Sequence, residues 1–83
     1  MGLETFTRLG LDLKSREIAT IAVLTALGNA QSQLKVHIQS SVNVGCTREE
    51  VAEVIMQIAV YAVPAALNGI FAAKEVFQAR DEM

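Results

Sequence analysis

The clearest structural signal in this sequence is a helix start near its middle. Thr47 stands three residues before Glu50, the spacing of a capping box, in which each of the two side chains accepts a hydrogen bond from an N–H group at the start of the helix. Apolar side chains then recur every three or four positions, the spacing of one helix face, at Val51, Val54, Ile55, Ile58 and Ala62. The pattern predicts a helix that begins after Thr47 and buries this face, while polar side chains such as Glu53 lie along the other side.

Helical spacing also precedes this segment, and strand-like alternation is hard to find. Leu3–Leu9 predicts a short helix that stops at Gly10. Ser15 is the expected N-cap of a longer helix, which Gly28 and the asparagine after it would end, because both residue types tolerate the left-handed conformation. A further helix is expected over residues 30–44, with an apolar stripe at Leu34, Ile38 and Val42.

Helical spacing continues after the capping-box segment. Pro64 either starts a last helix in its first turn or kinks a continuing one. The charged tail Arg80–Met83 is expected to fray. The sequence as a whole predicts one all-α domain over residues 1–83, built of about four helices with short connections.

The composition excludes several classes of protein. Hydrophobic residues make up 52% of the chain and charged residues 19%, with a formal net charge of −2. The chain is therefore too apolar to be disordered and lacks the basic excess that binding to nucleic acid requires. Because a chain of 83 residues can hide only part of so much apolar surface in its own core, we expect it to bury some of this surface against copies of itself or another partner.

Membrane and metal sites are not expected either. The longest apolar runs, Ile18–Leu27 and Ile58–Leu67, are about half as long as a membrane span. The N-terminus lacks the basic and apolar regions of a signal peptide, so we expect a soluble cytoplasmic protein. Cys46 is the single cysteine and His37 the single histidine, which argues against a disulfide within the chain and against a protein-built zinc site.

His37 and Glu17 are the candidates for acid–base chemistry. His37 stands three residues after Leu34 and one before Ile38, at the edge of the predicted buried stripe, where an imidazole can be half desolvated and still reachable. Glu17 would open the first long helix, where the helix dipole favours a carboxylate. If that helix and the next are antiparallel, Glu17 comes near His37 and favours its protonated form. The alternative is that His37 is a structural residue at a core edge or a subunit contact.

Two further side chains have a structural interpretation and a functional one. Tyr61 could point its hydroxyl into a pocket, but core packing with the hydroxyl at the surface is the expected case. Cys46 lies just before the Thr47 cap, where a helix N-terminus could partly activate a thiol. Because no second thiol exists, we interpret Cys46 as a small buried residue at a helix junction.

Four segments, in order and at the right distances, resemble the carboxymuconolactone decarboxylase family. Residues 16–28 resemble the opening of the family pattern, and residues 34–37 resemble its Leu-x-x-His segment. Residues 43–54 are similar to its Asn-x-Gly-x-Thr-x-Glu-Glu block. Residues 57–68 resemble its Tyr/Pro-Ala-Ala segment. The decarboxylase branch commonly has Tyr-x-Gly-x-Pro here, whereas residues 61–64 read Tyr-Ala-Val-Pro, without the glycine and one residue shorter.

The resemblance implies an alkylhydroperoxidase-like all-α fold whose protomers interlock as a homotrimer or homohexamer. It implies a decarboxylase of 4-carboxymuconolactone or a related small acidic lactone that works without a cofactor. His37 and Glu17 match the family's histidine and glutamate and would be the catalytic acid–base pair. Arg16 and Tyr61 would help to bind the substrate.

The resemblance also includes a second branch, with alkylhydroperoxidase or peroxiredoxin-type activity. That branch carries a Cys-x-x-Cys pair seven and four residues before the histidine. These positions are Ala30 and Gln33 here, so thiol peroxidase activity is not expected. A non-catalytic oligomeric domain of the same fold, acting in binding or in structure, remains the alternative to a decarboxylase.

Overall fold

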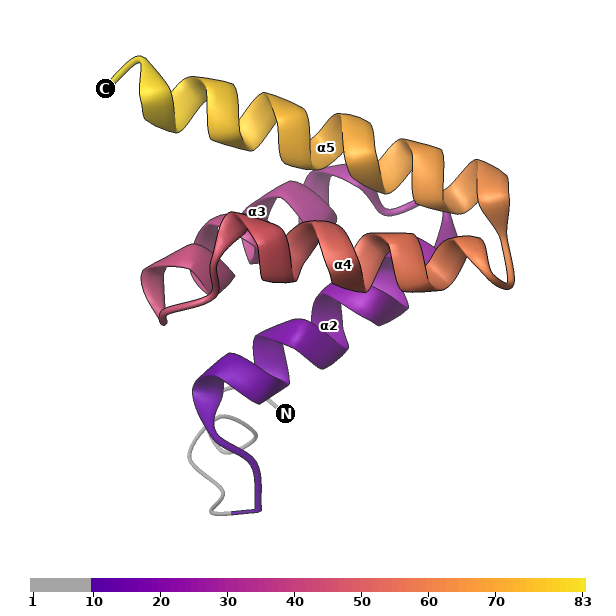
Figure 1. Ribbon diagram of the computed structural model, residues 1–83, viewed down its shortest axis with the longest axis horizontal. Helices are drawn as coiled ribbons and strands as arrows, with labels where there is room; N and C mark the ends of the chain where they lie inside the picture. The colour runs from indigo at the N-terminus through magenta and orange to yellow at the C-terminus, as the bar shows by residue number, and fades with distance from the viewer. Residues whose placement is uncertain (1–9) are drawn as a thin grey trace.

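The structure is a computed structural model that describes residues 10–83, and it is helical, with no strand in this part of the chain. The helix expected at Leu3–Leu9 lies outside the described residues. The described helices are α2 (Leu13–Leu27), α3 (Gln31–Asn43), α4 (Arg48–Ala59) and α5 (Val63–Asp81). Figure 1 shows α5 lying across α3 and α4, with α2 on their other side. The predicted all-α fold is therefore confirmed.

The capping box predicted at the start of α4 is present. The Thr47 side chain accepts a hydrogen bond from the backbone N–H of Glu50 at 3.0 Å, and the Glu50 side chain accepts one from the backbone N–H of Thr47 at 2.9 Å. Gly28 ends α2 as predicted, with a φ of 74° that a side chain would disfavour. These local signals place both helix ends correctly.

The start of α2 was predicted wrongly. Its N-cap is Asp12, whose carboxylate accepts a hydrogen bond from the backbone N–H of Ser15 at 2.7 Å, so Ser15 lies inside the helix. Aspartate and serine are about equally good caps, and the choice between them depends on where the chain enters the fold. As a consequence, Glu17 is the fifth residue of the helix and not part of its first turn.

The junction between α4 and α5 also differs from the prediction. The predicted buried face continued to Ala62, whereas α4 ends at Ala59 and Ala62 is the N-cap of α5. Pro64 lies in the first turn of α5, where its missing N–H costs nothing. Of the two roles considered for this proline, the structure shows a helix start and not a kink.

The C-terminal end of α5 is held by polar contacts. The helix continues to Asp81, whose carboxylate accepts two hydrogen bonds from the Arg48 guanidinium at 2.6 and 3.1 Å. Arg80 donates to the side-chain oxygen of Gln39 at 3.0 Å. The expectation that the whole tail frays is therefore wrong for Arg80 and Asp81, because these contacts join α5 to α3 and α4.

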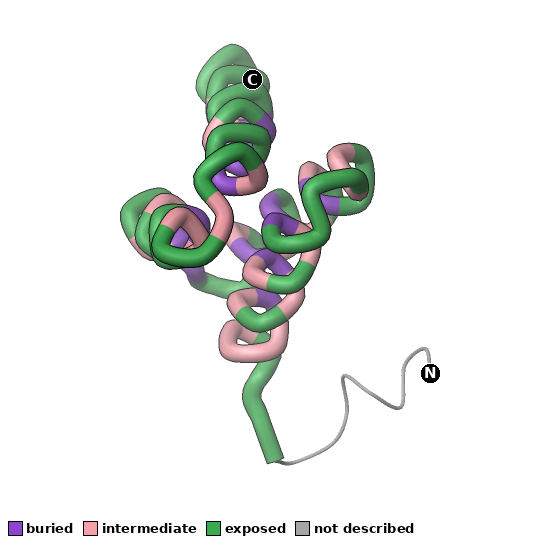
Figure 2. The backbone as a smooth tube through the Cα atoms, turned by 90° about the vertical axis from the view of Figure 1, so that its right-hand side faces the viewer, coloured by how far each residue is buried: buried purple, intermediate pink, exposed green. Residues whose placement is uncertain are grey.

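The core lies between the four helices (Figure 2). Its large members are almost completely buried, at Ile21, Leu34, Ile38, Val51 and Ile55. The surface that α5 turns toward them is made largely of small residues, at Ala66, Gly69, Ala72 and Ala73. A Cβ atom at Gly69 would lie 2.8 Å from Cγ2 of Ile55, so α5 approaches this closely because Gly69 has no side chain.

Candidate functional site

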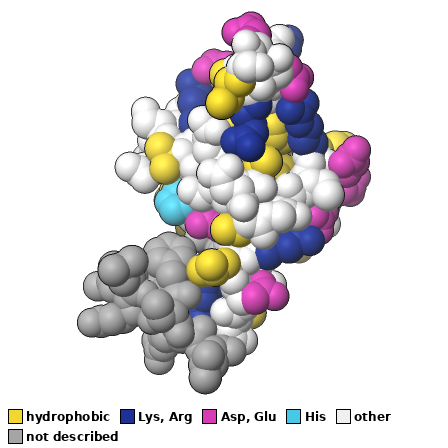
Figure 3. Space-filling view, turned by 90° about the vertical axis from the view of Figure 1, so that its left-hand side faces the viewer, with side chains coloured by type: hydrophobic (Ala, Val, Ile, Leu, Met, Phe, Trp, Pro, Cys, Tyr) yellow, Lys and Arg dark blue, Asp and Glu magenta, His cyan; other side chains and the backbone are white. Residues whose placement is uncertain are grey.

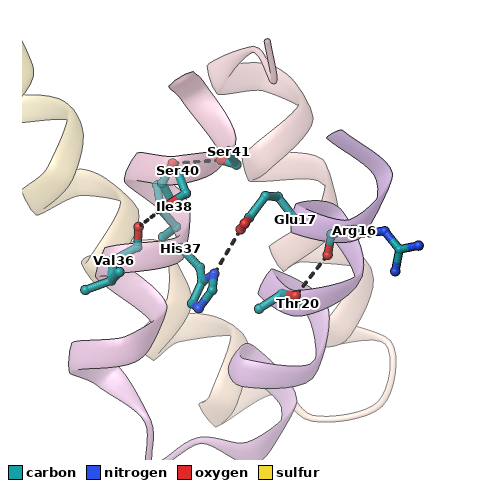
Figure 4. A network of polar contacts seen from close by, with 8 residues as sticks. All are labelled: Arg16, Glu17, Thr20, Val36, His37, Ile38, Ser40 and Ser41. Carbon is teal, nitrogen blue, oxygen red and sulfur yellow. Dashed lines mark hydrogen bonds and ion pairs between the residues drawn. The ribbon is translucent and has the colours of Figure 1, made fainter. Parts of the chain in front are cut away.

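Glu17 and His37 meet across the boundary between α2 and α3. Oε2 of Glu17 lies 2.9 Å from Nδ1 of His37, although the two residues are 20 positions apart in the chain (Figure 4). The side chain of Glu17 is 8% exposed and that of His37 is 24% exposed. The predicted proximity of this pair is confirmed, and the carboxylate is the more deeply buried partner.

Helical spacing explains why this carboxylate is buried. The three buried residues of α2 are Glu17, Ile21 and Thr25, which follow one another at intervals of four and form one face of the helix. Glu17 therefore occupies a core-facing position in the second turn, so stabilisation by the helix dipole does not explain it. A buried carboxylate requires hydrogen-bonding partners, and His37 supplies one.

The contact with Glu17 also decides which nitrogen of His37 is available for chemistry. When Glu17 is ionised, Nδ1 carries a proton and donates a hydrogen bond to the carboxylate. Nε2, the second ring nitrogen, takes no part in this hydrogen bond. Within residues 10–83, Nε2 has no hydrogen-bonding partner. Figure 3 shows that the histidine, coloured cyan, reaches the surface beside an acidic side chain. Nε2 can thus exchange a proton with a molecule bound at this surface.

Buried residues of α3 lie close to His37 in the sequence. Leu34 and Ile38 are buried on either side of it in α3, and Ser41 is buried one turn further along. The Ser41 hydroxyl donates to the carbonyl oxygen of Ile38 at 2.7 Å, so it takes no part in the ion pair (Figure 4). His37 therefore lies at the edge of the apolar stripe, as its spacing predicted.

The two predicted substrate-binding residues are not brought to this pair. Arg16 points its guanidinium away from His37, and its Nε donates to the carbonyl oxygen of Leu11 at 3.2 Å (Figure 4). Tyr61 lies in the connection between α4 and α5 and is 82% exposed. The expectation that the Tyr61 ring packs in the core is therefore wrong, because the chain has already left α4 when it reaches this residue.

Cys46 is a buried junction residue, as interpreted from the sequence. Only 5% of it is exposed, and its backbone N–H donates to the carbonyl oxygen of Ser41 at 2.9 Å. Burial raises the pKa of the Cys46 thiol, and the nearby Glu50 carboxylate raises it further. Activation by the helix N-terminus is therefore outweighed, and the thiol is protonated at neutral pH.

The structure adds a recess that the candidate residues did not reveal. It has a volume of about 260 Å³ and is lined by residues of α2 alone, at Ala19, Thr20, Val23 and Leu24. Thr20 is three residues after Glu17 and therefore lies on the same side of α2, one turn further along. The corresponding signal in the sequence is the uncharged run from Ile18 to Leu27, which is too short for a membrane span and is apolar on more than one side of the helix.

Residues 10–83 contain neither a metal-binding cluster nor a membrane-spanning helix. No group of three side chains from histidine, cysteine, aspartate and glutamate lies close enough to hold a metal ion in this part of the chain. None of the described helices is both long enough and apolar enough to cross a membrane.

Known proteins are similar to this chain over most of its length. The chain is 38% identical over 76 residues to the 4-carboxymuconolactone decarboxylase of Acinetobacter baylyi, an alignment that covers 90% of this chain and 56% of that protein. It is 35% identical over 81 residues to an uncharacterized 15.0 kDa protein of Paracoccus denitrificans, covering 95% of this chain and 60% of the relative. The chain thus spans less than two thirds of either relative. The model of the carboxymuconolactone decarboxylase family matches residues 1–75, and the chain belongs to this family.

Proposed function

We propose that the protein is a decarboxylase of a small acidic lactone, 4-carboxymuconolactone or a close relative, and that His37 and Glu17 are its acid–base pair. The contact between Nδ1 of His37 and Oε2 of Glu17 carries this proposal. The similarity to a 4-carboxymuconolactone decarboxylase supports the substrate class.

The reaction requires one positioned proton donor. When the bond between the ring carbon and the carboxylate breaks, carbon dioxide leaves and its bonding electron pair stays on the unsaturated lactone. A carbon of the lactone must then gain a proton. Protonated His37 gives this proton from Nε2, while Glu17 stabilises the imidazolium through Nδ1. The lactone itself delocalises the electron pair, so we propose that no cofactor takes part.

Glu17 has a second role, which is to orient the ring. A carboxylate bonded to Nδ1 fixes the tautomer of the neutral imidazole and the direction of Nε2. Arg16 and Tyr61 remain predictions as substrate-binding residues, and the proposal does not depend on them.

The test is a spectrophotometric decarboxylation assay on 4-carboxymuconolactone with the full chain. We expect turnover by the wild-type protein and its loss in His37→Asn. We choose asparagine because its side-chain amide can still donate a hydrogen bond to Glu17, as Nδ1 does, but cannot deliver a proton to a carbon atom. A folded His37→Asn protein with wild-type turnover would contradict the proposed role of His37. A wild-type protein without turnover on lactone acids would favour the alternative, a binding or structural domain.

A further inference from the structure

Thr20 is a polar residue of α2 that the proposed acid–base step does not use. It stands three positions after Glu17, so the two side chains lie on the same side of the helix, one turn apart. The residue is half-buried, and Figure 4 shows its side chain pointing from α2 toward the imidazole of His37. Thr20 therefore reaches the candidate site from the same helix as the buried carboxylate.

The hydroxyl group of Thr20 is committed to the backbone of its own helix. Its Oγ1 donates a hydrogen bond to the carbonyl oxygen of Arg16 at 2.9 Å. A hydroxyl has a single hydrogen, so in this arrangement it cannot also donate to the His37 ring or to a substrate. The same bond selects one of the two rotamers that threonine adopts in a helix. The group that Thr20 can present to His37 is therefore its methyl group, Cγ2.

The imidazole needs a contact of this kind because Glu17 holds it at one atom only. The hydrogen bond joins Nδ1 to Oε2 of Glu17 at 2.9 Å and leaves the tilt of the ring open. The ring turns about χ2, a torsion whose distribution in histidine is broad. The side chain of His37 is 24% exposed, and water on that side does not limit the rotation. A second contact is therefore required to keep Nε2 in one direction.

We propose that Thr20 is a positioning residue for His37. Its methyl group packs against the imidazole and limits the tilt of the ring, while the hydrogen bond to Arg16 holds the methyl group in place. Thr20 also lines the recess of about 260 Å³ on α2, so without the methyl group the ring would have open space into which to tilt. The inference rests on the proposed function, because it concerns the direction from which Nε2 delivers its proton.

Two substitutions separate the methyl group of Thr20 from its hydroxyl group. Thr20→Val keeps the branched shape and removes the hydroxyl. Thr20→Ser keeps the hydroxyl and its bond to Arg16 and removes the methyl group. Serine, threonine and valine have similar helix propensities, so each variant is a control for the stability of the other.

The first test is steady-state decarboxylation of 4-carboxymuconolactone by the full chain, at a temperature where all three proteins are folded. A catalytic group displaced by about 1 Å can lose on the order of 100-fold in rate. For a looser ring we expect Thr20→Ser to lower kcat about 10-fold without changing KM, because Thr20 does not touch the substrate. We expect Thr20→Val to stay within about threefold of the wild type. Equal kcat values in the three proteins, or a loss in Thr20→Val alone, would overturn the positioning role, and the second result would assign the hydroxyl to the substrate.

The second test observes the ring and does not need turnover. His37 is the single histidine, so its ring signals are assigned at once in an NMR spectrum. We expect the order parameter of the Cδ2–H bond of the ring to fall in Thr20→Ser and to keep its wild-type value in Thr20→Val. Equal order parameters in all three proteins would overturn the proposal. A wild-type protein without turnover would refute the proposed function, and the order parameters would still decide whether Thr20 holds the ring.

Discussion

Oε2 of Glu17 and Nδ1 of His37 are 2.9 Å apart and join the second turn of α2 to the middle of α3. The two partners differ in their access to water: Glu17 is buried in the core-facing row of α2, while His37 keeps part of its ring at the surface. The carboxylate is thus fixed by the fold, and its contact with Nδ1 holds an imidazole that is 24% exposed. This asymmetry suits a proton donor that must keep its orientation and still reach a substrate.

The pair is expected to act as a unit in catalysis. His37→Ala and Glu17→Gln are each expected to lower the rate of lactone decarboxylation on the order of 10²- to 10⁴-fold, the usual contribution of a positioned acid–base group. The double variant is expected to be little worse than the more damaging single variant, because residues that act together are not additive. Steady-state kinetics of the three variants measures this. Multiplicative losses would show that the two residues work independently.

The same contact is expected to contribute to stability. His37→Ala leaves the buried Glu17 carboxylate without the hydrogen bond from Nδ1, and such an unpaired group costs about 1–3 kcal/mol of unfolding free energy. In the double variant with Glu17→Gln the loss is expected to be smaller than the sum of the two single losses. Urea denaturation of the four proteins, including the wild type, gives these values. Strict additivity would mean that the contact adds nothing to the folded state.

Cys46 is expected to be chemically inert in the folded protein. Burial raises the pKa of its thiol, so the reactive thiolate is scarce at neutral pH. We expect slow reaction with a thiol reagent under native conditions and fast reaction in urea. Cys46→Ser is expected to keep any activity within a few-fold of the wild-type value. Complete loss of activity in a folded Cys46→Ser protein would instead indicate a redox role.

Gly69 is expected to be essential for the packing of α5. Alanine normally stabilises a helix interior relative to glycine, but here the new Cβ would lie 2.8 Å from Cγ2 of Ile55 and 3.0 Å from Cγ2 of Thr25. Overpacking of this kind costs about 1–3 kcal/mol, so Gly69→Ala is expected to lower the melting temperature. Gly10→Ala serves as the control, because a Cβ there meets no atom within 4 Å. A more stable Gly69→Ala protein would show that α5 shifts easily.

Acid is expected to weaken the junction between α2 and α4. The hydrogen bond from the Thr47 backbone N–H lowers the pKa of Glu50, and the hydrogen bond from Lys14 lowers it further. A carboxylate whose pKa is lower in the folded state stabilises the fold above its unfolded-state pKa, and this contribution disappears as the pH falls through the folded-state pKa. We therefore expect the melting temperature to decrease as the pH is lowered below about 4. Glu50→Gln is expected to flatten this dependence, and an unchanged slope would contradict it.

Local patterns in the sequence were sufficient to predict the helix ends that depend on contacts within a few residues. The capping box of Thr47 and Glu50 and the left-handed Gly28 depend on atoms a few residues apart, and both were predicted correctly. The position of His37 at the edge of a buried stripe also follows from spacing alone. Its approach to Glu17 required one further assumption, that two consecutive helices joined by a short turn are antiparallel.

Contacts between helices decided the rest. Asp12 rather than Ser15 caps α2, so Glu17 lies in the second turn, and its side chain lies on the buried face of the helix. Tyr61 lies outside the core because α4 ends before it. The Arg16 guanidinium points away from His37 and donates a hydrogen bond to the carbonyl oxygen of Leu11. The sequence alone determined which stretches are helical and where most of them end, since those interactions are made within one or two turns. Which helices face one another, and so which side chains meet, was set by the packing of helices distant in sequence, where the burial of apolar surface outweighs local preference.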